Sequence, residues 1–133
     1  DVKTDIGWEV YSPALKSLVE ELYARYDLPA LYITENGAAY NMGVENGEVD
    51  DQPRLDYYAD HLSVCADLIS EGYPVHGYFA WSLMDNFEWA EGYTMRFGLV
   101  HVDYQTQVRT VKKSGKWYGE LAGAFPHGNH RAG

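Results

Sequence analysis

Two short and almost continuously apolar runs constrain the fold of this chain more than any other feature. They are Leu31–Thr34 and Val75–Trp81, and both are rich in β-branched and aromatic residues. Runs without alternating polar residues are typical of strands covered on both faces, as in parallel sheets. Between them, apolar residues from Leu55 to Ile69 recur at three- and four-residue spacing, which predicts an amphipathic helix. Strand, helix and strand in this order predict a right-handed parallel crossover unit.

Two more helices flank this unit. The first is predicted over Pro13–Tyr26, because Ser12 is a good N-cap residue and proline suits the first helical position. The middle helix begins after Asp50–Pro53 and ends at Gly72. The remaining predicted elements are an extended segment over Phe97–Tyr104, a connection over Gln105–Thr110 and a final helix near Ser114–Ala124.

Two parallel strands and three helices do not close a hydrophobic core. Strands of this kind need neighbours on both edges and helices on both faces. No internal repeat or shift in composition marks a domain boundary. We therefore expect an α/β fold in which residues 1–126 are one segment of a larger (β/α) assembly, with its other strands supplied from elsewhere. Residues 127–133 are expected to form a polar tail.

Charge and composition argue against several kinds of partner. Twenty Asp and Glu residues against ten Lys and Arg residues give a net charge of −10, which disfavours nucleic acid and acidic membrane surfaces. No apolar run approaches the ~20 residues that cross a bilayer. The single Cys65 cannot form an internal disulfide and no signal-peptide pattern is present, so we expect a cytoplasmic location. His127 and His130 lack a third ligand at a suitable spacing, and we expect neither a metal nor a cofactor.

The first apolar run leads directly into a carboxylate, Glu35, followed by the turn-forming pair Asn36-Gly37. This order places Glu35 at the carboxyl end of a parallel strand, where sheets and barrels of parallel strands carry their chemistry. An ordinary solvated acid at a strand end would fit the same stretch. The loop from Asn36 to Pro53 is longer than the ~12–15 residues usual for a connection, and loops of that length often line a site.

Two motifs extend this interpretation, namely ITENG at residues 33–37 and GYFAWSLMDNFEW at residues 77–89. Together they resemble the carboxyl-terminal part of family 1 glycoside hydrolases, the β-glucosidase family. The resemblance implies a (β/α)₈ TIM barrel in which 31–35 and 75–81 are the last two strands. An N-terminal fragment would then supply the other six strands, together with the family's Asn-Glu-Pro motif and its acid/base glutamate. Shorter matches at Ile6–Tyr11, Arg54–Leu62, Arg96–Val100 and Lys113–Tyr118 carry the resemblance over nearly the whole chain.

The resemblance also implies a role for particular residues. Glu35 would be the nucleophile of a retaining β-glycosidase, which forms a covalent glycosyl-enzyme from a terminal β-D-glycosyl residue. A second carboxyl group about 5–5.5 Å away would act as acid and base. The resemblance also implies five sugar-binding residues. Trp81 would stack under the glycone ring, Glu88 would bind the outer hydroxyls of the glycone, and Trp89 would donate its indole N–H to the sugar. Phe97 would lie at the wall of the same subsite, and Asn36 would be a supporting residue.

Other interpretations fit parts of the sequence. Core packing would also explain the tryptophans, and sequence distance alone does not exclude Glu88 as the second catalytic carboxylate. A non-catalytic sugar-binding piece would use Trp81, Glu88 and Trp89 without turnover, and an assembly fragment of a split barrel would mainly bind the remaining strands. The resemblance implies that the phospho-β-glycosidase branch of the family has another residue in place of the glutamate found here at position 88. An unphosphorylated β-glucoside or related β-glycoside is therefore the expected substrate. We expect the isolated chain to be inactive, because it contains no Asn-Glu-Pro motif.

Overall fold

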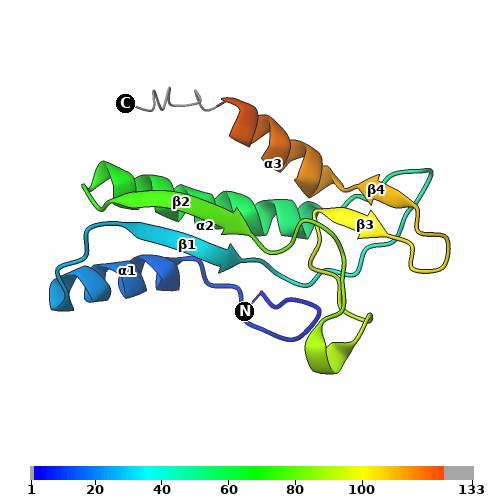
Figure 1. Cartoon of the computed structure of the whole chain (residues 1–133), viewed down its shortest axis with the longest axis horizontal. Helices are drawn as coiled ribbons and strands as arrows, with labels where there is room; N and C mark the ends of the chain where they lie inside the picture. Colours follow the sequence, from blue (N-terminus) through cyan, green and yellow to red (C-terminus); the bar gives the residue numbers. More distant parts are fainter. Residues whose placement is uncertain (1, 125–133) are drawn as a thin grey trace, which may run out of the picture.

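The computed structural model describes residues 2–124 of the chain (Figure 1). The predicted tail over 127–133, with His127 and His130, lies outside the described residues. In chain order the elements are α1 (Pro13–Arg25), β1 (Leu31–Asn36), α2 (Gln52–Ser70), β2 (Val75–Ala80), the short 3₁₀ helix η1 (Trp89–Glu91), β3 (Val100–Val102), β4 (Arg109–Val111) and α3 (Lys113–Ala124).

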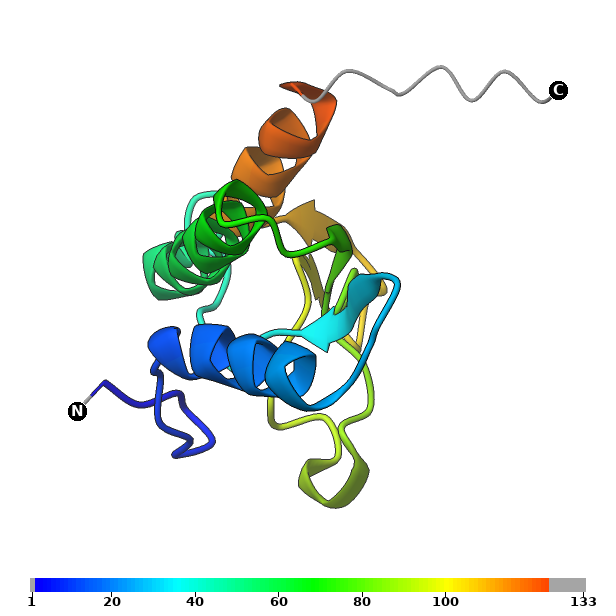
Figure 2. The ribbon, with the colours of Figure 1, turned by 90° about the vertical axis from the view of Figure 1, so that its left-hand side faces the viewer.

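β1 and β2 pair as parallel strands, with α2 connecting them. Leu31 lies opposite Val75, and Asn36 lies opposite Ala80. The predicted strand, helix and parallel strand are thus confirmed. In Figure 2 the helices gather on one side of the β1–β2 sheet, and α2 contacts both α1 and α3. Parallel pairing brings the carboxyl ends of both strands to the same edge of the sheet.

One face of the sheet stays exposed within residues 2–124. Leu31 and Ile33 are half-buried, whereas Tyr32 between them is 53% exposed. Phe79 of β2 is 56% exposed. An exposed apolar face agrees with the expectation that these strands belong to a larger (β/α) assembly, whose other parts would cover that face.

Some details at the ends of the elements differ from the predicted ones. α1 ends at Arg25, and β1 continues through Glu35 to Asn36 because Asn36 still pairs with β2. Ser12 lies at the N-cap position, but its side chain makes no capping bond. Its φ of −58° and ψ of −30° are helical, and the first amides of the helix bond to backbone carbonyls instead.

The segment before α3 forms an antiparallel pair that was not predicted. Only Val100–Val102 of the predicted extended segment is a strand, and it pairs with Arg109–Val111. The second strand begins within the predicted connection over Gln105–Thr110 and ends one residue beyond it, at Val111. Each strand has three residues, too few for a periodic pattern to be recognised in the sequence.

Buried charged side chains hold the loops that follow β1 and β2. Arg54 of α2 is fully buried and pairs with Asp51 at 2.9 Å. Its guanidinium also donates to the carbonyl oxygens of Ala38 and Tyr40, and to that of Arg96 at 3.0 Å. One side chain therefore fixes the long loop after β1 against both α2 and the loop after β2.

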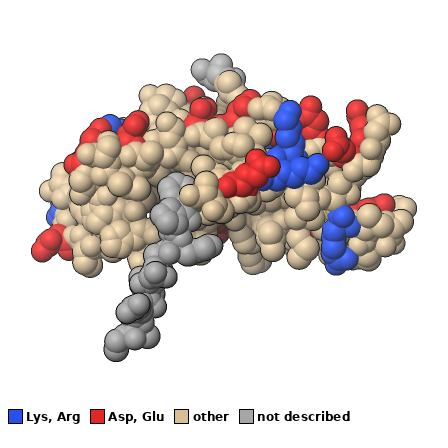
Figure 3. Space-filling view, turned by 90° about the horizontal axis from the view of Figure 1, so that it is seen from above, with Lys and Arg blue, Asp and Glu red and all other residues tan. Residues whose placement is uncertain are grey.

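The surface agrees with the acidic composition. Acidic side chains are scattered over the face in Figure 3, with few basic ones between them. Among the helices within residues 2–124, none is long and apolar enough to cross a membrane.

Candidate active site

A cavity of about 270 Å³ lies at the carboxyl ends of β1 and β2. It is lined by residues from both strand ends, from α2, from the amino-terminal segment and from the loop after β2. Five of the predicted site residues share it, namely Glu35, Asn36, Trp81, Glu88 and Phe97, and Trp8, Gly37 and Tyr57 complete the lining. Residues distant in sequence thus enclose one space that contains two carboxylates and several aromatic rings.

Glu35 and Trp81 are brought together by the backbone. The Trp81 amide donates to the Asn36 carbonyl at 2.7 Å, which continues the parallel pairing beyond the end of β2. The Tyr58 hydroxyl donates to the Trp81 carbonyl at 3.0 Å. A Cβ on Gly37 would lie only 1.8 Å from that same carbonyl oxygen, so glycine permits the close approach.

Asn36 is held by its side chain as well as by its carbonyl. The Tyr78 hydroxyl donates to Asn36 Oδ1 from the neighbouring strand. Burial raises the pKa of Tyr78 far above its ordinary value, so this hydroxyl stays protonated and remains a donor. The residue that follows Glu35 is therefore fixed both to Tyr78 of β2 and to Trp81 just beyond that strand, in keeping with a supporting role.

Glu88 and Trp89 lie in the loop after β2, but only Glu88 faces the cavity. The Glu88 amide donates to the Gly92 carbonyl at 2.6 Å and closes a tight turn. Gly92 has a φ of +58° and Trp89 a φ of +40°, which for a tryptophan is uncommon. The Trp89 side chain is 84% exposed and does not line the cavity. The structure thus does not bring Trp89 together with the other predicted residues.

Phe97 forms a buried part of the cavity wall. It is 4% exposed, and its ring lies 6.3 Å from that of Trp8. Trp81, by contrast, is 36% exposed. One aromatic residue is thus packed into the wall while another offers part of its surface.

Sequence reasoning gave no role to Tyr57 or Trp8. Tyr57 stacks on His61 with ring centroids 4.0 Å apart and meets Tyr58 edge to face at 5.7 Å. Burial raises the pKa of Tyr57, and the Asn36 side chain opposes that shift. For Tyr57, the sequence signal for a site residue was its place on α2 beside the apolar stripe of that helix and not on it. Tyr57 and Trp8 also lie within the stretches that resemble the β-glucosidase family.

A larger groove, of about 740 Å³, lies between α2, β2 and α3. Its lining is mostly apolar, includes Cys65, and contains no carboxylate. It runs along the first residues of β2 and not its carboxyl end. Within residues 2–124 no group of His, Cys, Asp and Glu side chains is arranged to hold a metal ion.

The parallel strand–helix–strand unit, with its cavity at the carboxyl ends of the strands, has the arrangement found in open α/β sheets and in (β/α) barrels. Residues 1–125 match the family Glycosyl hydrolase family 1. The chain belongs to that family, and its fold is a segment of the family 1 TIM barrel.

Individual relatives agree with this assignment. The chain is 81% identical over 130 residues to a β-glucosidase of Agrobacterium sp., covering 98% of this chain and 28% of that protein. It superposes on the Agrobacterium tumefaciens virulence factor SghA with a TM-score of 0.93 and 80% identity, covering 96% of this chain and 28% of SghA. SghA has also been solved in complex with its substrate analog salicin. The chain is also 46% identical to a 6-phospho-β-galactosidase of Streptococcus equi subsp. zooepidemicus, covering 90% of this chain and 26% of that protein.

Proposed function

We propose that this chain supplies the nucleophile and part of the glycone site of a retaining β-glycosidase that acts on terminal β-D-glucosyl or related residues. The observation that carries the proposal is the shared cavity of Glu35, Trp81 and Glu88. A carboxylate beside an aromatic surface and a second hydrogen-bonding carboxylate suits a sugar, which has apolar faces and polar edges.

In the proposed reaction Glu35 attacks the anomeric carbon while the bond to the leaving oxygen breaks. A second carboxyl group, outside this chain, gives its proton to that oxygen. The same group then takes a proton from water, which attacks the anomeric carbon and releases Glu35 as a free carboxylate. Glu88 holds sugar hydroxyls in this scheme and takes no part in bond breaking.

The remaining lining residues serve binding in the proposal. Trp81 offers an exposed part of its ring to the apolar face of the glycone. Phe97 closes the wall, and Asn36 keeps the end of β1 in place. Trp89 is exposed next to Glu88 and lies outside the lining of the cavity, and the proposal includes its indole N–H as a sugar donor only on the family resemblance.

The test is a hybrid protein in which this chain replaces the matching segment of the Agrobacterium sp. β-glucosidase. Because the two are 81% identical, the hybrid is expected to fold and to hydrolyse 4-nitrophenyl β-glucoside. Glu35→Gln should lower kcat by more than about 10⁴-fold, as loss of a covalent nucleophile does elsewhere. The matched control is Glu45→Gln, an exposed glutamate in the loop after β1, which should change kcat little.

The outcomes separate the functions considered. Turnover by the hybrid that is lost in Glu35→Gln supports the nucleophile. Glucose binding without turnover in the parent hybrid would favour a non-catalytic sugar-binding role instead. Near-normal turnover in Glu35→Gln would refute the proposal. The isolated 133-residue chain is expected to be inactive with the same substrate.

A further inference from the structure

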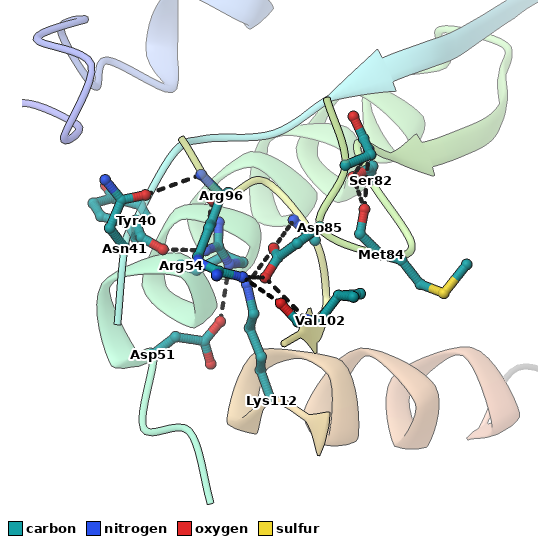
Figure 4. Close-up of polar contacts among 12 residues, drawn as sticks. Tyr40, Asn41, Asp51, Arg54, Ser82, Met84, Asp85, Arg96, Val102 and Lys112 are labelled. Atoms are coloured by element: carbon teal, nitrogen blue, oxygen red, sulfur yellow. Dashed lines mark hydrogen bonds and ion pairs between the residues drawn. The ribbon is translucent and has the colours of Figure 1, made fainter. Parts of the chain in front are cut away.

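The carboxylate of Asp85 is the centre of a buried polar cluster in the loop after β2 (Figure 4). Its Oδ1 accepts from Lys112 Nζ at 2.8 Å and from the Gly98 amide at 3.0 Å. Its Oδ2 accepts from Arg96 Nη1 at 2.6 Å and from the Val102 amide at 3.3 Å. The Asp85 side chain is fully buried, so two cations and two amides take the place of water.

These contacts fix both neighbours of Phe97. Arg96 precedes it, Gly98 follows it, and both bind the same carboxylate. A Cβ on Gly98 would lie 2.2 Å from the Asp85 nitrogen, so the two segments are in close contact. The Phe97 carbonyl also accepts from the Ser82 amide at 3.0 Å. Phe97 can therefore shift in the cavity wall only if the arrangement around Asp85 changes.

Arg96 also joins this segment to the loop after β1. Its amide donates to Asn41 Oδ1 at 2.9 Å. Its carbonyl accepts from the Tyr40 amide at 3.1 Å and from Arg54 Nη2 at 3.0 Å. Figure 4 shows these residues converging from both loops and from α2. A single residue thus links Asp85 to the loop that leaves the end of β1.

We propose that Asp85 is a positioning residue for the sugar site, which by binding Arg96 and Gly98 sets where Phe97 lies against the glycone. This inference rests on the proposed function. Asp85 does not line the cavity, so it acts only through the segment that it holds. If its role were stability alone, restoring stability without Asp85 would also restore sugar binding. The positioning role predicts that binding stays weak.

The experiment uses the hybrid protein with two variants. Asp85→Asn keeps the side-chain shape but leaves Lys112 and Arg96 without a counter-ion, so the melting temperature should fall. Combining it with Lys112→Met removes one of those cations and should recover much of the melting temperature. Leu68→Ala is the control for lost stability alone, because Leu68 is fully buried on α2 and does not line the cavity.

In both Asp85 variants, KM for 4-nitrophenyl β-glucoside and Ki for glucose are expected to rise about tenfold. kcat should stay within about threefold, because the cavity wall contacts the glycone in the ground state and the transition state alike. Leu68→Ala should lower the melting temperature and leave both constants unchanged. A double variant that melts like the parent and has the parent's KM would overturn the positioning role.

Amide hydrogen exchange gives a readout that does not need activity. In the double variant, exchange over residues 95–100 should rise about tenfold or more, while exchange over α1 stays as in the parent. An inactive parent hybrid would refute the proposed function and leave this measurement possible. Unchanged exchange over 95–100 would refute the positioning role whether or not the hybrid is active.

Discussion

Replacing Gly37 by Ala should separate the two strand ends that carry Glu35 and Trp81. A Cβ at this position would lie 1.8 Å from the Trp81 carbonyl oxygen and 2.8 Å from its carbon. Real Cβ atoms essentially never approach closer than 3.0 Å, so the backbones must move apart by the difference, at least 1.2 Å. Because the obstructing atoms belong to the backbone, no side-chain rotation can relieve the contact.

This displacement also breaks the hydrogen bonds that hold Trp81. They are the 2.7 Å bond from its amide to the Asn36 carbonyl and the 3.0 Å bond from the Tyr58 hydroxyl to its own carbonyl. Their loss costs about 1–3 kcal/mol in the free energy of unfolding. Overpacking adds about 1–3 kcal/mol, so the total is about 2–6 kcal/mol. Misplacing a reacting group by about 1 Å should lower kcat/KM about 10²-fold.

Urea denaturation and kcat/KM of the hybrid protein measure the two effects separately. Gly43→Ala is the matched control, because a Cβ there meets nothing within 4 Å and no positive φ is involved. We expect Gly43→Ala to change the free energy of unfolding by less than about 1 kcal/mol. If Gly37→Ala behaved like Gly43→Ala in both assays, the proposed dependence of the site on this close approach would be wrong.

Three further predictions concern charge. The hybrid should have a kcat/KM for 4-nitrophenyl β-glucoside more than about tenfold higher than for its 6-phosphate. Glu88→Gln should reduce that preference, because it removes a charge that repels phosphate. An unchanged ratio of the two kcat/KM values in Glu88→Gln would contradict this role of Glu88. The pKa of Asp85 is lowered, because burial, which raises it, is outweighed by Lys112 and Arg96. A lowered folded-state pKa contributes stability above the ordinary value of 3.8, and this is lost as pH falls through the folded value. Urea denaturation at about pH 5 and about pH 3 should therefore show a larger acid loss in the parent than in Asp85→Asn combined with Lys112→Met, and equal losses would contradict it. Arg54→Lys should lower the free energy of unfolding by more than about 3 kcal/mol, because a lysine cannot make the buried hydrogen bonds of the guanidinium to three carbonyls. The control, Arg25→Lys at an exposed position, should lower it almost not at all. Similar urea midpoints for the two variants would refute this prediction.

The two strands and the meeting of their carboxyl ends could be predicted because the backbone determines them. Continuous apolar runs identified β1 and β2, and parallel pairing alone requires their carboxyl ends to lie together. A glutamate at one end and a tryptophan at the other then share an edge. The register of Asn36 with Ala80 agrees with this reasoning.

Other features could not be predicted because they depend on contacts between distant side chains. Asp85 and Lys112 are 27 positions apart, and charged residues in a sequence are normally assigned to the surface. Burial also lowers the pKa of Lys112 to about 8, with the charge of Arg54 acting in the same direction and Asp85 opposing it. Trp89 follows Glu88 in the motif, yet the tight turn closed by Gly92 directs it away from the cavity.

The cavity is therefore held by three different means, and each limits what sequence can reveal. Backbone register holds Glu35 beside Trp81, and it leaves an apolar pattern that can be recognised. Buried charge holds Phe97, and it leaves no pattern, because the partners lie on separate segments. A local turn holds Glu88, because its amide donates to the Gly92 carbonyl at 2.6 Å and its carbonyl accepts from the Glu91 amide at 2.8 Å. Both bonds stay within residues 88–92, so neither ties Glu88 to the strand ends that carry Glu35 and Trp81.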